Sequence, residues 1–404
     1  MTTRYQTPWG PSWDPLEITM HTDGGDALGK VNRIEKAIAR WSAVDADLLE
    51  VTCALDPANA ALLDTSGSVL ISARVGTERL LAVPAVSVVE DAGDPVAGRI
   101  RVIAAGARTL LDAAVAPPDP HLTLESQPPR QESRYRGPVE DIVKGIIVDA
   151  VRWSGHPIRV LPSHRRGRTV TLTSKLTPAG DLIDEALAGS GHRLDVIGWI
   201  PGDPLPTGIT ATAPCALIDV VPWRARPGLI WSAEAGDIDT WALEYRRATI
   251  TAVLTGERLD NPGADDDQPA GFRYRAHDRG ARPWATRWAY RGLRGGQSAE
   301  STAAELLEDS AASASADIRL TPAAQWRPQR HAGAGTYWLG DRVQVSLPVV
   351  GVVEQVITEI VATMTPSTFH IAPVVATPDS LSRSIHRRVA RLGERVARLE
   401  RGQA

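Results

Sequence analysis

Residues 336–364 read TYWLGDRVQVSLPVVGVVEQVITEIVATM, and this stretch shows the architecture of the chain most clearly. Within it, the apolar residues Val343, Val345 and Leu347 alternate with polar neighbours. A period of two is typical of a strand that is buried on one face only. The sequence therefore predicts half-buried β-structure in this part of the chain.

After Pro378 the apolar residues follow the spacing of a short coiled coil. They recur at steps of four and three residues, at Ile385, Val389, Leu392, Val396 and Leu399. Arg395 and Glu400 occupy g and e positions, where opposite charges pair between neighbouring helices. About two and a half heptads are too few for a stable isolated helix, so the seam predicts association with other copies. Valine at a with leucine at d favours two strands more often than three.

Length and composition limit the possible classes of protein. A chain of 404 residues is expected to hold two to four domains. Its net charge of −4 argues against a nucleic-acid binder driven by overall charge, and its two cysteines cannot form a disulfide framework. No leader-like or membrane-spanning apolar run is present, so we expect a soluble chain without a secretory signal. The basic residues are mostly arginine, which suggests an actinobacterial host.

The N-terminal block reads as one helix followed by strands. Val31, Ile34, Ile38 and Trp41 have helical spacing, which predicts a short helix over residues 29–42. Beyond it, apolar and polar residues alternate in three segments separated by turn-rich pieces. We therefore expect a small antiparallel barrel or sandwich there.

The hydrophobic pattern of the sequence changes at Pro138, after a proline-rich linker at 118–136. An apolar helical face follows, with Pro138 at the first helical position and Gly155 at the end. Strand candidates and a second helix around residues 178–188 complete a compact α+β module. Strands return from Trp231 onward. Residues 256–297 show no clear period and read as long loops, and residues 299–314 read as a helix.

No catalytic, cofactor-binding or metal-binding constellation stands out. The nine histidines lack the spacing of known metal sites. The basic cluster at 165–168 reads as a solvated hairpin loop, with contact to nucleic acid or an acidic neighbour as the alternative. Five of the twelve tryptophans fall in periodic segments and are expected in the core: Trp153, Trp199, Trp223, Trp231 and Trp241. Trp284, Trp288 and Trp326 lie in less regular sequence, where they could form a platform for stacking sugars, although burial in the core or an interface is the simpler interpretation.

Four segments together resemble the siphophage minor tail proteins of the tail-hub type, which are related in fold to baseplate hubs. They are residues 41–91, which begin WSAVDADLLEVTCALDPANA, VIAAGARTLLDAAVAPPDP at 102–120, LIWSAEAGDIDTWALEYRRATITAVLTGE at 229–257 and YWLGDRV at 337–343. The last matches the Leu-Gly-Asp-x-Val pattern of that family, in which Gly340 and Asp341 make a tight turn before a strand.

The resemblance implies an α+β fold that is mainly antiparallel β, with two small hub-type β-barrels. The expected parts are a helix and first barrel (1–117), an α+β module (118–222), a second barrel (223–262 and 332–377), an insertion (263–331) and the coiled-coil stub (378–404). It also implies a homotrimer whose six barrels form a pseudo-sixfold ring at the distal tail tip. The expected partners are the distal tail protein ring, the tape measure protein, other tail-tip proteins and DNA in passage, with assembly in the host cytoplasm and no membrane insertion.

Two other functions remain open from the sequence. The chain could be a tail-associated cell-wall hydrolase, although no triad or zinc set is visible. It could also be a host-glycan-binding tail module that uses its exposed tryptophans. The resemblance favours a structural virion protein without enzymatic activity or cofactor.

Overall fold

The computed structural model divides the chain into two compact units, each described here by itself. Unit 1 comprises residues 1–241 and 317–378, and unit 2 comprises residues 242–316 and 379–404. The structure describes residues 16–64, 66–91, 98–119, 121–123, 126–127, 133–174, 177–258, 272–278, 286–292, 299–310, 313–321, 327–330, 335–348 and 351–376.

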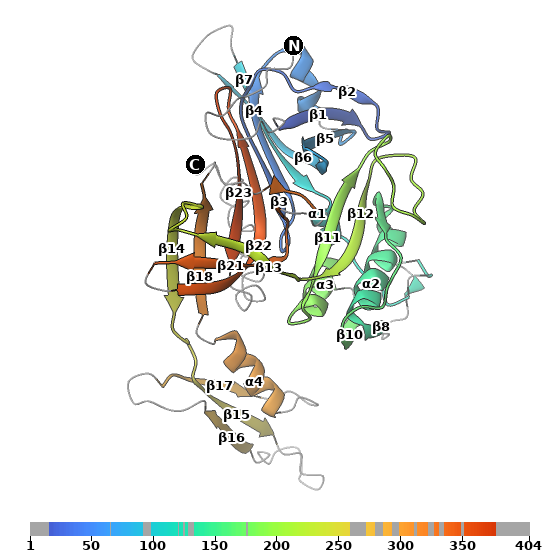
Figure 1. Ribbon diagram of the computed structural model, residues 1–404. Helices are drawn as coiled ribbons and strands as arrows, with labels where there is room; N and C mark the ends of the chain where they lie inside the picture. The colour runs from blue at the N-terminus through green and yellow to red at the C-terminus, as the bar shows by residue number, and fades with distance from the viewer. Residues whose placement is uncertain are drawn as a thin grey trace. The chain divides into compact units, whose positions relative to one another are not determined.

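Unit 1 is organised around one sheet of 11 strands. Their order is β13-β21-β22-β3-β4-β7-β6-β5-β1-β2, with β23 beside β22, and only the β13–β21 pair is parallel. The strands are β1 (Glu17–Thr22), β2 (Ala27–Lys30), β3 (Ile34–Ser42), β4 (Leu48–Ala54), β5 (Val69–Val75), β6 (Glu78–Asp91), β7 (Gly98–Gly106), β13 (Arg224–Ser232), β21 (Asp341–Leu347), β22 (Gly351–Met364) and β23 (Phe369–Ala376). Orange strands from the C-terminal block thus lie beside blue strands from the N-terminal block (Figure 1).

The predicted alternation of β21 is confirmed, because Val343, Val345 and Leu347 are all buried and their polar neighbours are more exposed. In β4, Leu49, Val51 and Cys53 are buried in the same alternating manner. These side chains form the core on one face of the sheet, as the period of two predicts.

The helix predicted over residues 29–42 is wrong, because the chain there forms β2 and β3. In β3 the buried residues are Ala37, Ala39 and Trp41, which alternate as a strand requires. Two of the three are alanines, which carry little weight in a hydrophobic pattern. Ile38 lies on the other face, and a bulge between Ile34 and Lys36 places Ile34 outside the simple alternation. The large apolar residues taken alone therefore showed a false helical spacing.

The strands of unit 1 contain a structural repeat. β5 and β21 both have seven residues, and each is followed by a strand of 14 residues, β6 or β22. The eighth residue of each long strand, Ala85 or Thr358, sits in a bulge against the next strand, β7 or β23. β3 likewise corresponds to β14 (Ile238–Arg246), which also has nine residues and runs from unit 1 into unit 2. β14 pairs with β18 (Ser313–Leu320). Apart from the separate pair of β14 and β18, the described strands of the two repeats share one sheet and form no closed barrel, so the expectation of two separate barrels is corrected in this respect.

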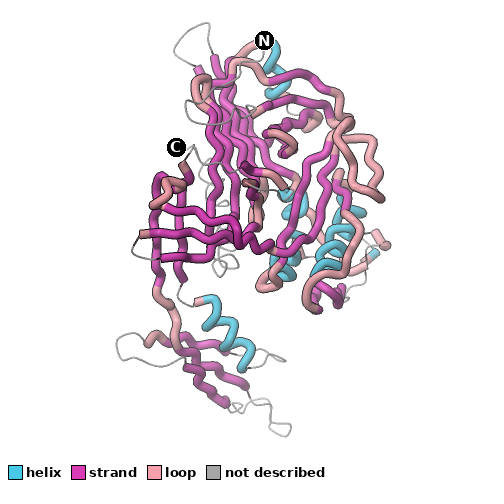
Figure 2. The backbone as a smooth tube through the Cα atoms, viewed as in Figure 1, coloured by secondary structure: helices cyan, strands magenta, loops and turns pink. Residues whose placement is uncertain are grey.

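The α+β module follows β7 and the short helix α1 (Arg108–Ala113). Its main helix α2 (Val139–Ser154) begins immediately after Pro138, one position later than predicted. The helix ends at Gly155, whose positive φ of 68° is easy for glycine. The second predicted helix is α3 (Ala179–Leu187). Both helices, drawn in cyan in Figure 2, pack their apolar faces into a common buried core with the module's strands.

The strands of the module form two small sheets. β8 (Ser133–Pro138) pairs with β10 (Thr169–Ser174). β12 (Cys215–Pro222) lies between β11 (His192–Trp199) and β9 (Ile158–Val160). Unit 1 also contains the 3-10 helix η1 (Pro57–Leu63) and the short parallel pair β19 (Arg327–Pro328) and β20 (Thr336–Tyr337).

Unit 2 contains a three-stranded sheet with one helix. β15 (Ala252–Arg258) lies between β16 (Phe272–Asp278) and β17 (Trp288–Gly292). The helix α4 (Ala299–Asp309) packs Ala303 and Leu307 on Val253 of β15. The helix predicted over 299–314 is confirmed as far as Asp309, whereas residues 313 and 314 belong to β18. The prediction of long loops over 256–297 is wrong for the parts that β15, β16 and β17 occupy. Their short length and polar composition concealed the strands.

Candidate functional site

The structure tests the sequence-predicted site residues only in part. The coiled-coil residues at 385–400 and Trp284 lie outside the described residues. Trp288 lies on β17 with 45% of its surface exposed, and Tyr290, two positions along the strand, is 73% exposed. Because alternate residues of a strand point to the same face, the two rings share one face of the unit 2 sheet.

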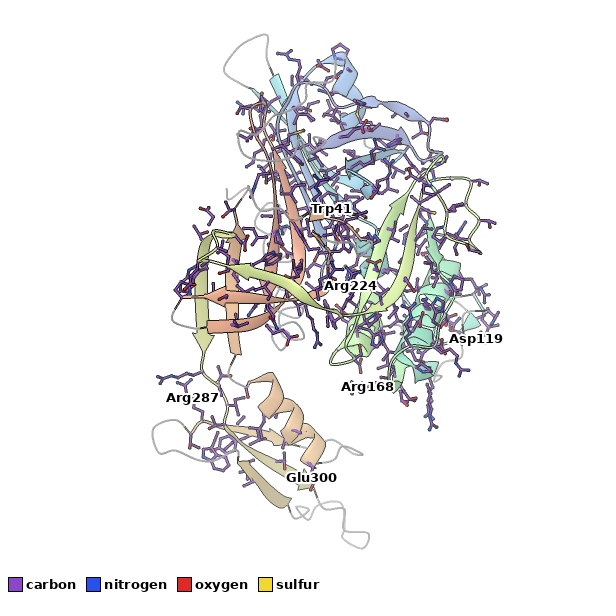
Figure 3. All side chains as sticks on the ribbon, viewed as in Figure 1. Trp41, Asp119, Arg168, Arg224, Arg287 and Glu300 are labelled. Carbon is purple, nitrogen blue, oxygen red and sulfur yellow. The ribbon has the colours of Figure 1, made fainter. Side chains whose placement is uncertain are left out.

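The two repeats of unit 1 meet at a seam between β22 and β3. Residues 359–364 of β22 pair antiparallel with residues 37–42 of β3. Trp41, labelled in Figure 3, lies on β3 at this seam opposite Ile360, and both side chains are buried. Ala362 is opposite Ala39 and has no exposed surface. The seam is thus a strand-to-strand contact with a packed apolar face.

The corresponding half of β6 has an open edge. β5 pairs only with the beginning of β6, up to Ala82, and β7 pairs with its other side along residues 82–91. Among the described strands, none pairs with the free side of residues 86–91. Val86, Val88 and Val89 are exposed there, Val88 by 44% and Val89 by 52%. A long apolar strand with unpaired backbone groups favours pairing with another strand.

A second open edge belongs to β14. Its partner among the described strands is β18 alone. Trp241 on this strand is 39% exposed, so the expectation that it belongs to the core is wrong. A partly exposed tryptophan on a strand with one open edge is typical of a surface that becomes buried on association.

A buried ionic cluster joins three parts of unit 1. The Arg330 Nε lies 3.3 Å from Glu78 Oε2 on β6, and the Arg330 backbone N–H donates to Glu78 Oε1 at 2.9 Å. The guanidinium also pairs with Asp195 on β11 and lies 4.9 Å from the centre of the Trp338 ring. Asp195 accepts a further hydrogen bond from Arg193 at 2.7 Å. One arginine therefore ties the first repeat and the α+β module to the segment before β20.

The charges in this cluster are fixed by their neighbours. Burial by itself would raise the pKa of Asp195, but the nearby Arg330 and Arg193 outweigh it and lower that pKa well below the usual range. Burial would lower the pKa of Arg330, yet Asp195 and Glu78 raise it overall. Asp195 and Arg330 consequently stay ionised across the physiological pH range, and their pair acts as a structural connection.

The Leu-Gly-Asp-x-Val segment forms the turn that its sequence predicts. Gly340 has a φ of 78°, and Asp341 directly behind it begins β21. The fully buried Asp341 carboxylate binds Arg224 of β13 through two hydrogen bonds of 2.6 and 2.9 Å, and it accepts one from the Trp338 backbone at 3.0 Å. Arg224 is labelled in Figure 3. The motif thus fixes the start of β21 against β13.

The basic cluster at 165–168 faces acidic residues of the same chain. Arg166 binds Glu140 at 3.0 Å and Asp219 at 3.1 Å, and Lys144 lies 2.6 Å from each of these carboxylates. Burial would raise the pKa of Glu140, but hydrogen bonds from Lys144 and Arg166 outweigh it and lower the pKa to about 2. The prediction of a solvated loop is wrong for Arg166, which contacts acidic neighbours, and it fits the exposed residues Arg165, Gly167 and Arg168.

Sequence reasoning missed both open edges and the Arg330 cluster. Arg330 and Glu78 are 252 residues apart, so no local spacing could connect them. The open edge of β6 had one signal, the valines at 86, 88 and 89, which do not follow the strict alternation of a half-buried strand. Within the described ranges, no group of three His, Cys, Asp or Glu side chains is placed to hold a metal ion. No helix in this described part is long and apolar enough to cross a membrane.

The comparison with solved structures bears directly on this architecture. A 43 kDa tail protein of prophage MuSo2 from Shewanella oneidensis superposes with a TM-score of 0.53 at 13% identity, over 90% of this chain and 99% of that one. A tail protein from Neisseria meningitidis MC58 superposes with a TM-score of 0.52 at 9% identity, over 92% and 99% of the two chains. The fold is shared with phage tail proteins. No protein-family model and no curated protein sequence matches the chain.

Proposed function

We propose that the chain is a structural subunit of a phage tail tip, a hub that acts by association and without enzymatic turnover. The observation that carries the proposal is the fold shared with two tail proteins over nearly their whole length. The two repeats of unit 1 give it a physical basis, because a chain with two similar strand blocks can supply two similar sectors of a ring.

In this proposal three copies form a ring with six similar sectors, which matches a hexameric tail tube above it. The ring closes the distal end of the tube and lets the tape measure protein and DNA pass. One face of the sheet supports such a conduit, because its charges are paired with opposite charges. Arg101 lies 3.0 Å from Glu50, and Arg40 lies 3.7 Å from Glu359. A polyanion would find little net charge to bind there.

Light scattering on the purified full-length chain tests the oligomeric state. The proposal predicts a mass of about 130 kDa, three times the 43.3 kDa of one chain. A Leu392→Asp variant tests the coiled-coil prediction separately. If the stub drives assembly, the variant has the mass of one chain, and if the sheets drive it, the variant remains a trimer. A single-chain mass for the wild type at every concentration would contradict the trimer.

A second candidate function, glycan binding, is favoured by one observation. Trp288 and Tyr290 present two exposed aromatic rings on one face of the unit 2 sheet, which suits stacking against sugar rings. An array of bacterial surface polysaccharides, probed with the full-length chain, tests it. Binding that is lost in Trp288→Ala and retained in Trp288→Phe would support this function, and binding that is unchanged in Trp288→Ala would exclude this platform.

A further inference from the structure

In one repeat, the second half of β22 has a strand beside it, whereas the equivalent half of β6 in the other repeat has none among the described strands. In β22, the ninth to fourteenth residues, 359–364, pair with β3 of the other repeat. In β6, the ninth to fourteenth residues are 86–91, and no described strand pairs with their free side. The difference is visible in burial at the twelfth position, because Ala362 is fully buried at the seam whereas its counterpart Val89 is 52% exposed.

The strand that would fill the open position is also present in the chain. β3 corresponds to β14, each with nine residues and an aromatic residue at the eighth, Trp41 or Tyr245. β3 pairs with β4 on one side and with β22 on the other. β14 has β18 on one side, and its other side is open among the described strands. The second repeat therefore offers an unused edge of the kind that the first repeat uses at the seam.

We propose that β6 of one copy pairs with β14 of the next copy, in the antiparallel register that β22 and β3 use within a chain. Transferring that register places Val86 opposite Arg246, Val88 opposite Glu244 and Asp91 opposite Trp241. This inference deepens the proposed function and rests on it, since it names the surface through which copies of a ring-forming hub meet.

The pairing accounts for features that a single copy leaves unexplained. It would bury exposed valines of β6 and bring the partly exposed Trp241 of the neighbouring copy into the interface. The two edges differ from each other, so the contact is head-to-tail, and such contacts generate a closed ring when the rotation closes. Neighbouring sectors of the ring would then be joined by equivalent strand pairs. These are β22 with β3 within a chain and β6 with β14 between chains. Six sectors from three copies satisfy this arrangement.

Two cysteines on each chain test the register directly. In a Val88→Cys, Glu244→Cys variant, the proposal predicts disulfides between copies and a covalently closed trimer on a non-reducing gel. The matched control is Val88→Cys with Leu243→Cys, which is one residue out of register and would place the two cysteines on opposite faces. The native cysteines Cys53 and Cys215 are both buried and can remain. Equal cross-linking in both variants, or none in either, would overturn the proposed register.

A charge placed on the edge tests the surface independently of disulfide geometry. Val88→Lys should reduce the trimer to single chains of unchanged thermal stability, because a lysine on an exposed edge opposes strand pairing. The control is Val352→Lys on the corresponding strand β22, where the valine is 62% exposed and its strand segment already pairs with β21. If the wild type and Val88→Lys are both trimers, this surface is wrong and the hub proposal stands. If the wild type itself is a single chain, the trimeric hub fails as well.

Discussion

Arg330 is the residue on which the internal connections of unit 1 converge. It contacts Glu78 and Asp195, and all three side chains are largely buried. Removing the guanidinium leaves two buried carboxylates with fewer partners, which typically costs about 3–5 kcal/mol. We therefore predict that Arg330→Met lowers the free energy of unfolding by about 3 kcal/mol or more in urea titrations.

The control for this prediction is an arginine in an exposed pair. Arg342 lies 3.7 Å from Glu354, and both side chains are substantially exposed. Exposed pairs contribute at most about 1 kcal/mol, so Arg342→Met should have a small effect. Equal losses in the two variants would show that Arg330 does not hold unit 1 together.

Glu140 makes a pH-dependent contribution to the stability of the α+β module. Its pKa is about 2 in the folded chain, below the value of about 4.3 in an unfolded one. The folded state therefore gains stability from the ionised carboxylate above about pH 4 and loses it as the pH falls toward 2. Glu140→Gln should lower the free energy of unfolding by about 3 kcal/mol at pH 7. This deficit should shrink between pH 5 and pH 2.5, and a deficit that is constant over this range would contradict the assignment.

At the scale of elements, β6 and β11 approach each other too closely for a side chain at Gly198. A Cβ atom on Gly198 would lie 2.6 Å from Leu81 Cβ and 2.8 Å from the Leu81 backbone nitrogen. The strands must separate to admit it, so Gly198→Ala should cost about 1–3 kcal/mol in thermal or urea unfolding. Gly228→Ala on β13 meets no atom within 4 Å and serves as the control. A loss that is no larger for Gly198→Ala than for the control would rule out tight packing between β6 and β11.

The elements differ in how well the sequence predicts them. β4, β21, α2 and α3 were predictable because large apolar residues mark their buried faces, as Val143 and Ile146 do in α2. β3 was not, since its buried face consists of Ala37, Ala39 and Trp41, and small residues hide a period of two. The open edges of β6 and β14 depend on which strands become neighbours. That is a property of the sheet, and local spacing carries almost no information about it.

At the scale of the whole molecule, the repeat is the feature that connects fold and function. One copy of the chain pairs its two repeats through β22 and β3, and among its described strands one edge of each kind has no partner. In a ring where each copy makes the equivalent contact with the next, the open edges of β6 and β14 are both paired. The fold shared with phage tail proteins supports a place for this ring in a virion tail.

The most direct test of this account is electron microscopy of the purified full-length chain viewed along the ring axis. The account predicts closed particles with six similar sectors and true threefold symmetry, with continuous strand density between β6 of one copy and β14 of the next. Val88→Lys should abolish these particles, and Val352→Lys should leave them intact. Closed rings whose subunits meet through other strands would contradict the proposed contact, and the absence of any ring in the wild type would contradict the hub itself.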